Sequence, residues 1–189
     1  ILSCSVTGWS YGGNKDSQQI WSWEDTDLMI SSEEGPYTGS IWGNHKPTSQ
    51  PLLADLDLDG DAELVISAIR ESDNTPQVIA ISLPSSGSPS ILWNKRLGYG
   101  SHGSDPVFVQ TDENTAYVML TTTESTNGAM WLWKLDSSSG DPSWDGKSLG
   151  NLDGDSNVPH IRLPGPIVAN LDSDDNPEII VTIPTDSDS

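Results

Sequence analysis

The amino-acid sequence predicts an all-β protein built of four-stranded antiparallel sheets, in the arrangement of β-propeller blades. Three observations predict this fold class. Short runs rich in β-branched residues are separated by Gly, Pro, Ser and Asn. No segment carries apolar residues at helical spacing over three turns. A proline-led strand followed by an acidic turn recurs along the chain, which is typical of a repeat protein.

Each repeat begins with a proline and an apolar strand. Residues 51–57 (PLLADLD) match residues 166–172 (PIVANLD), and residues 106–112 (PVFVQTD) form a more divergent repeat. The three prolines are 55 and 60 residues apart. A second strand follows the acidic turn, and residues 63–69 (ELVISAI) are its clearest example. The alternation of strand, acidic turn and strand predicts a β-hairpin at the start of every repeat.

The second half of the repeat contains a third strand, a Ser/Gly turn and a tryptophan-bearing strand. Residues 78–87 lead to Trp93 in this way, and residues 130–140 lead to Trp144. Each repeat is therefore expected to supply four antiparallel strands. Four strands within about 40–60 residues is the size of one propeller blade.

The repeats divide the chain into complete and partial blades. We expect a half blade at 1–25, an insert or linker at 26–50, blades at 51–98 and 106–150, and a half blade at 166–184. Propellers contain at least about four blades. The rest of the ring is therefore expected from a longer chain or from other protein chains. The two half blades can also close on each other, which removes exposed sheet edges.

The acidic turns carry oxygen-bearing residues at alternate positions, which predicts a calcium site. Ca²⁺ takes about six to eight oxygen ligands. Positions 1, 3, 5 and 9 of a nine-residue loop supply side-chain oxygens, and position 7 supplies a backbone carbonyl. The expected ligands of the first loop are Asp55, Asp57, Asp59, the carbonyl of Asp61, and Glu63. Those of the last loop are Asn170, Asp172, Asp174, the carbonyl of Asn176, and Glu178.

The residues of the two loops favour a calcium site in a β-hairpin over an EF-hand or a magnesium site. Gly60 provides the tight turn of the first loop, and Asp175 replaces it in the last. An EF-hand is excluded, because its twelfth position would be Ile66 within a strand pattern. Mg²⁺ is disfavoured because it prefers a tight octahedron with retained waters. The last loop has one fewer carboxylate and is expected to bind more weakly.

The middle repeat is expected to lack a metal. It offers Gln110, Asp112 and Asn114, but its second strand begins about two residues early. A plain polar hairpin turn is therefore expected there.

The composition excludes several classes of partner. The 189 residues include 28 acidic and 8 basic side chains, for a formal charge of −20. Nucleic acid and anionic membrane surfaces both require basic patches, so neither is expected as a partner. No apolar run is long enough for a membrane span, so membrane insertion is not expected. Cys4 is the only cysteine, which excludes an intrachain disulfide.

The tryptophans allow two interpretations. Trp21 and Trp23 are two residues apart, as are Trp131 and Trp133, so each pair faces one side of its strand. Packing between blades is the favoured interpretation, and a sugar-stacking platform for glycans is the alternative. The sequence has no phosphate-cradling glycine loop and no Gly-x-Ser-x-Gly elbow. The chain is therefore not expected to be an enzyme.

The pattern Asp55-x-Asp57-x-Asp59-Gly60-x-x-Glu63, followed by an aliphatic strand, resembles the calcium loops of FG-GAP/VCBS-type propellers. This class includes the heads of integrin α-subunits. The Ser/Gly turns followed by tryptophan also resemble the blades of PQQ-like propellers. The chain lacks the Phe-Gly and Gly-Ala-Pro signatures of the FG-GAP repeat.

The resemblance implies an extracellular or cell-surface scaffold in which calcium stabilises the blade. We therefore expect a non-enzymatic module for adhesion, assembly or protein interaction. A carbohydrate-binding propeller and the propeller portion of a larger secreted enzyme are the alternatives.

Overall fold

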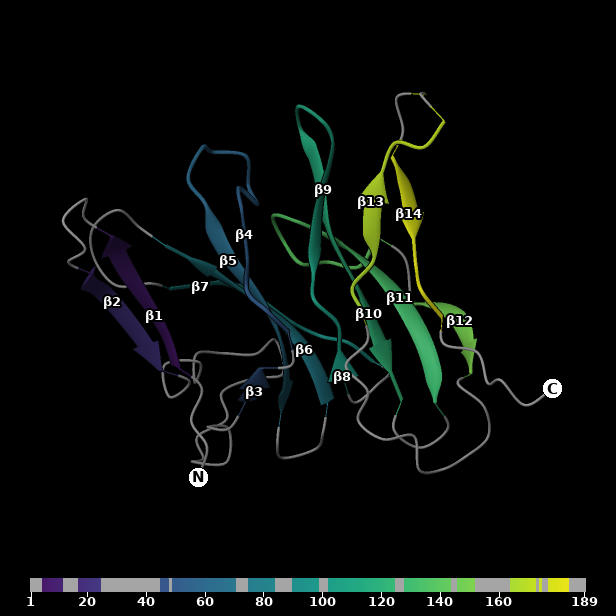
Figure 1. The fold of residues 1–189 in the computed structure, drawn as a ribbon, viewed down its shortest axis with the longest axis horizontal. Coiled ribbons are helices and arrows are strands. Elements are labelled where there is room, and N and C mark those ends of the chain that lie inside the picture. Colours follow the sequence, from purple (N-terminus) through teal and green to yellow (C-terminus); the bar gives the residue numbers. More distant parts are fainter. Residues whose placement is uncertain are drawn as a thin grey trace.

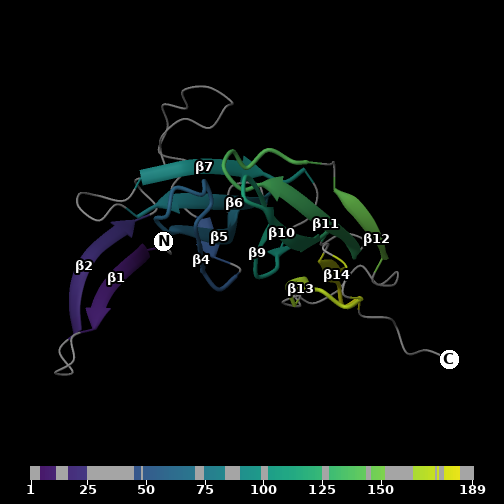
Figure 2. The same ribbon diagram turned by 90° about the horizontal axis from the view of Figure 1, so that it is seen from above.

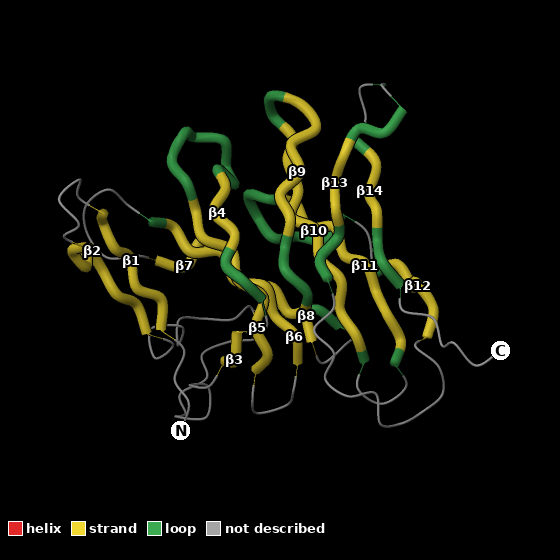
Figure 3. The backbone as a smooth tube through the Cα atoms, in the orientation of Figure 1, coloured by secondary structure: helices red, strands yellow, loops and turns green. Residues whose placement is uncertain are grey.

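The fold is described by a computed structural model. It covers residues 5–11, 17–24, 45–47, 49–70, 75–83, 90–98, 102–124, 128–143, 146–151, 164–172, 174 and 177–183. These residues form strands, turns and loops, with no helix among them (Figure 3). Every strand pairing between them is antiparallel. The all-β, antiparallel prediction is confirmed, and in this part of the chain no helix is long and apolar enough to cross a membrane.

Four groups of strands follow one another (Figure 1). The N-terminal hairpin is β1 (Ser5–Tyr11) and β2 (Ser17–Glu24). The first sheet contains β3 (His45–Pro47), β4 (Leu52–Ala54), β5 (Glu63–Arg70), β6 (Thr75–Ser82) and β7 (Ser90–Arg96). The second sheet contains β8 (His102–Gly103), β9 (Val107–Asp112), β10 (Thr115–Thr123), β11 (Ala129–Asp136) and β12 (Lys147–Asn151). The C-terminal hairpin is β13 (Ile167–Ala169) and β14 (Glu178–Ile180).

Each complete sheet is a four-stranded meander whose first strand is split in two. β4 pairs with the start of β5, where Ala54 lies opposite Glu63, and β3 pairs with its end, where Pro47 lies opposite Ala68. β9 and β8 divide the edge of β10 in the same way. β3 belongs to the stretch that the sequence assigned to an insert. The rest of that predicted insert, apart from Ser49 and Gln50, lies outside the described residues.

The first and second sheets pack face to face through a buried apolar cluster. Its members are Leu56, Val65, Val78, Ala80, Trp93 and Leu97 from the first sheet and Val118, Leu120, Trp133 and Leu135 from the second. Trp131 packs against the same cluster. Trp133 lies in this core and the partly buried Trp131 packs against it, in agreement with the packing role that the sequence favours. The side chains of Trp21 and Trp23 lie outside the described residues.

Equivalent positions of the repeat contact the next group of strands in each sheet. The register places Leu52 opposite Val65 in the first sheet, and Val107 opposite Met119 in the second. Val65 faces the second sheet, and Met119 faces the C-terminal hairpin, where it packs with Val181. The same repeat position therefore contacts the following sheet each time. This regular stacking places the loop between β4 and β5, the short hairpin between β9 and β10, and the loop between β13 and β14 one after another.

Candidate metal centre

The first acidic loop joins β4 to β5 and is closed by its own carboxylates. The N–H groups of Asp59 and Gly60 donate to the two carboxylate oxygens of Asp55, both at 3.0 Å. The N–H of Asp61 donates to Oδ1 of Asp59 at 2.9 Å. Leu58 and Gly60 have positive φ angles of 61° and 98°, and glycine adopts such a conformation without a Cβ clash. These bonds fold the chain back within one tight turn.

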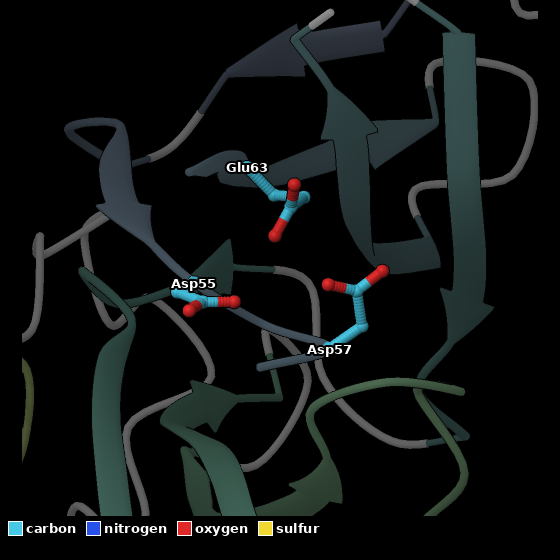
Figure 4. A group of neighbouring side chains, drawn as sticks. All are labelled: Asp55, Asp57 and Glu63. Carbon is cyan, nitrogen blue, oxygen red and sulfur yellow. The ribbon is translucent and has the colours of Figure 1, made fainter. Parts of the chain in front are cut away.

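Three carboxylates meet inside this loop (Figure 4). One oxygen each from Asp55, Asp57 and Glu63 lies within 4.8 Å of the other two. Glu63 is buried, with only 3% of its surface exposed. The N–H of Leu56 donates to its Oε2 at 2.8 Å, which holds the end of the loop against its beginning. The group can hold a metal ion, and its donors are all oxygens, which suit hard cations.

The environment of Glu63 disfavours a bare carboxylate. Burial raises the pKa of Glu63, and the negative charges of Asp57, Asp59 and Asp55 raise it further, while the hydrogen bond from the N–H of Leu56 opposes them. A bound divalent cation reverses this balance, because it attracts each carboxylate that otherwise repels the others.

A turn from the second sheet covers the back of the first loop. Ser137 lies in the turn after β11, and its hydroxyl donates to the carbonyl of Leu56 at 2.6 Å. The indole N–H of Trp93 donates to the carbonyl of Ser137 at 2.8 Å. Gly140 lies so close to Trp93 that an added Cβ would come within 2.6 Å of the ring. The neighbouring sheet thereby encloses Leu56, which is fully buried.

The last acidic loop, between β13 and β14, also gathers three carboxylates, but from its third, fifth and ninth residues in place of the first, third and ninth. Carboxylate oxygens of Asp172, Asp174 and Glu178 lie within 4.8 Å of one another. The N–H of Leu171 donates to Oε2 of Glu178 at 2.5 Å, as Leu56 does to Glu63. The side-chain amide of Asn170 donates to the carbonyl of Asp174. Asp172 and Asp174 are exposed, and Glu178 is half-buried.

The middle repeat forms a short hairpin in place of a loop. Strands β9 and β10 are joined by Glu113 and Asn114 alone. The N–H of Asn114 donates to Oδ1 of Asp112 at 2.8 Å, which closes the turn. Tyr117 occupies the register position that Glu63 has in the first loop. Because this residue is no longer a carboxylate, the turn lacks the ligand that β5 and β14 contribute.

The structure groups some predicted ligands and separates others. It unites Asp55, Asp57 and Glu63 in the first loop, and Asp172, Asp174 and Glu178 in the last. Asp59 and Asp61 are exposed, the carboxylate of Asp59 lies outside the first group, and Asn176 lies outside the described residues. Sequence reasoning missed the covering role of Ser137. The available signal was the Ser/Gly turn, which recurs before a tryptophan-bearing strand in both complete repeats.

Both loops gather three carboxylates that could hold a metal ion. No family model, no curated protein and no solved structure matches the chain. The functional assignment therefore rests on the geometry of the loops and on the stacking of the sheets.

Proposed function

We propose that this protein is a calcium-stabilised β-propeller module without catalytic activity, which acts outside the cell or at its surface in adhesion, assembly or protein interaction. One observation carries the proposal. Two loops at the same position of the repeat each gather three carboxylates, and in each the final glutamate accepts a hydrogen bond from the second residue of the loop. A repeated loop of this construction is suited to one ion for each hairpin.

Calcium fits these loops better than other cations. The donors are oxygens on a flexible loop, which suits the irregular coordination of Ca²⁺ more than the strict octahedron of Mg²⁺. Asp55 and Asp57 lie at the start of the first loop and Glu63 lies at its end. An ion between them links β4 to β5 and stabilises the hairpin. Loop sites with some solvent-exposed ligands suit calcium affinities of about 10⁻⁴–10⁻³ M, as in extracellular modules.

The stacking of the sheets supports a propeller. The residue before each repeat proline lies against its equivalent in the next sheet. The N–H of Gln50 donates to Oδ1 of Asp105 at 2.7 Å, and a Cβ on Gly165 would lie 2.3 Å from the carbonyl of Asp105. Strand β4 lies next to β9, and β9 lies next to β13. Inner strands that succeed one another through the same contacts are typical of blades around a common axis.

An interaction role is favoured over sugar binding by the tryptophans that the structure describes. Trp93 and Trp133 are buried in the cluster between the sheets, and Trp131 packs against it. Rings in these positions hold blades together and offer no exposed stacking platform.

The proposal is tested by thermal unfolding of the purified chain in EDTA, in 10 mM CaCl₂ and in 10 mM MgCl₂. Binding at 100 times Kd stabilises a protein by about 2.7 kcal/mol, which raises the melting temperature of a chain of this size by about 5–10 °C. We expect this rise with calcium and a smaller one with magnesium. Asp57→Asn should remove most of the rise, and Glu113→Gln, in the metal-free middle hairpin, should retain it. Equal melting temperatures in EDTA and calcium would contradict the proposal.

A further inference from the structure

The middle hairpin pairs an aromatic ring with a side-chain cation at the repeat position where the other two hairpins have a glutamate. Tyr117 occupies the register position of Glu63 and Glu178, the residues with which β5 and β14 begin. The ammonium group of Lys134 lies over the ring of Tyr117, with Nζ 3.6 Å from the ring centroid. The face of an aromatic ring is electronegative and attracts a cation, as a carboxylate does. All three hairpins therefore present an electron-rich group at this position.

The strand register explains how Lys134 reaches the ring. Lys134 lies on β11 opposite Met119 of β10, and Tyr117 precedes Met119 by two residues on the same face of the strand. Diagonal neighbours across an antiparallel pair are within reach of a long side chain. In the first sheet the equivalent of Lys134 is Ala80, which carries no charge. The first sheet therefore supplies no cation from this position, and its carboxylates are left to an external ion.

The surroundings of the pair strengthen the contact. Tyr117 is half-buried and packs against the apolar cluster between the second sheet and the C-terminal hairpin, to which Val168 and Val181 also pack. Lys134 is half-buried as well. The attraction is therefore stronger than that of a fully exposed pair, because water competes less for the ammonium group.

The short turn of the middle hairpin offers no cage for an ion. The acidic loops are residues 55–62 and 170–177, whereas Glu113 and Asn114 alone join β9 to β10. So short a turn cannot wrap its side chains around a calcium ion, which takes about six to eight oxygen ligands. The cation of this hairpin comes instead from β11, through Lys134, on the face of the sheet.

We propose that the ammonium group of Lys134 replaces the metal ion in the middle hairpin, so that this hairpin keeps its conformation without calcium while the loops on either side require it. The inference rests on the proposed calcium function and adds how the three hairpins respond to the ion. Both views place the hairpin of β9 and β10 between the hairpins that carry the acidic loops (Figures 1 and 2), and β9 lies next to β4 and β13. Loss of calcium should then loosen the two loops and leave the hairpin between them folded.

The first test is hydrogen exchange of the full chain, measured by mass spectrometry in EDTA and in calcium. We expect the amides of residues 55–62 and 170–177 to exchange at least about tenfold faster in EDTA, because local opening sets the rate of exchange. The amides of residues 109–117 should change by less than about twofold. A middle hairpin that calcium protects as strongly as the two loops would overturn the proposal.

The second test removes the charge of Lys134. Lys134→Met keeps a long apolar side chain, and we expect the amides of residues 109–117 to exchange about two- to tenfold faster, in EDTA and in calcium alike. Lys134→Arg keeps a cation over the ring and should exchange as the wild type does. Lys147→Met is the matched control, because Lys147 is exposed on β12 of the same sheet, and it should leave this exchange unchanged. Equal exchange in Lys134→Met and Lys147→Met would overturn the proposal.

The ring supplies a third test. Tyr117→Leu keeps an apolar side chain in the cluster and loses the electron-rich face, so the amides of residues 109–117 should again exchange faster. Adding Lys134→Met to Tyr117→Leu should have little further effect, because both changes remove the same contact. Fully additive effects on exchange would show that the two side chains act separately and would overturn the proposal.

The outcomes separate this inference from the proposed function. Exchange that responds to Lys134→Met but nowhere to calcium keeps the role of Lys134 in the hairpin and contradicts the calcium function. Exchange that responds to calcium in the two acidic loops but not to Lys134→Met keeps the calcium function and overturns the inference.

Discussion

The two acidic loops share a sequence pattern and an internal hydrogen bond, yet they lie in different surroundings. The first loop has a neighbouring sheet behind it, which encloses Leu56 completely and leaves Glu63 only 3% exposed. The last loop has no such neighbour among the described residues, and Leu171 is 63% exposed. The loop sequence therefore brings three carboxylates together in each loop, and the neighbouring sheet accounts for the burial of Leu56.

This difference indicates that the second sheet stabilises the acidic loop of the first sheet. Ser137 contacts the carbonyl of Leu56 and the indole of Trp93, so one turn of the second sheet contacts both the loop and the outer strand of the first. Removing the hydrogen bonds of that turn should leave the first loop more exposed, as the last loop is.

The largest effect is expected from truncating the enclosed leucine. Leu56→Ala leaves a cavity in the cluster between the sheets and should lower the free energy of unfolding by about 2–5 kcal/mol. Leu171→Ala removes an exposed side chain and should change this free energy by less than about 0.5 kcal/mol. Urea denaturation followed by tryptophan fluorescence measures both. Similar losses for the two variants would contradict the difference in cover.

A somewhat smaller effect is expected at Gly140, where the covering turn meets Trp93. Gly140→Ala places a Cβ at 2.6 Å from the ring and also occupies a positive φ of 72°. Strain and overpacking together should cost about 2–4 kcal/mol. Gly60→Ala has a positive φ of 98° but open space around it, so it should cost only about 1–2 kcal/mol. Equal losses of unfolding free energy for Gly140→Ala and Gly60→Ala in urea denaturation would show that the close contact with Trp93 adds no destabilisation.

The hydrogen bond from Ser137 is expected to contribute less again. Ser137→Ala leaves the buried carbonyl of Leu56 without this donor and should cost about 1–2 kcal/mol. It should also weaken calcium binding at the first loop and spare the last loop. Ser143→Ala, an exposed serine in the same connection, serves as the control and should leave both properties unchanged. Equal calcium affinities for Ser137→Ala and Ser143→Ala would argue that the turn containing Ser137 has no role in calcium binding.

The smallest effect is a dependence on pH at Asp136, which organises the covering turn. Burial raises the pKa of Asp136, but hydrogen bonds from the N–H and hydroxyl groups of Ser138 and Ser139 outweigh it and hold this pKa below its ordinary value. A lowered pKa in the folded state stabilises the protein above the ordinary value, about 3.9, and this contribution is lost as the pH falls through the folded value. The wild type should therefore be more stable than Asp136→Asn near pH 6, and the difference should shrink below about pH 4. Melting curves in EDTA that kept a constant difference would refute this.

Much of the local structure follows from the sequence. The strand predicted at 63–69 and the third strand predicted within 78–87 occur as β5 and β6, because β-branched runs bounded by turn residues leave few alternatives. The two carboxylate groups were also predictable, since alternate positions of a tight hairpin loop can turn their side chains to one centre. The short middle hairpin followed from its missing loop residues.

Other features could not be read from local patterns. Strands β3 and β8 are three and two residues long, which is too short to show any periodicity. Leu56 and Leu171 occupy identical positions in their motifs, so only the neighbouring sheet distinguishes the buried one from the exposed one. The sequence likewise gives no sign that Asp59 lies outside the group formed by Asp55, Asp57 and Glu63, because that separation arises from its hydrogen bonds within the turn.

The central claim is that both acidic loops bind calcium and that the first binds it more tightly. Isothermal titration of the metal-free chain with calcium measures this directly. We predict two sites, the stronger lost in Asp57→Asn and the weaker lost in Asp172→Asn. Titrations without binding heat above dilution, or with unchanged sites in both variants, would contradict the account.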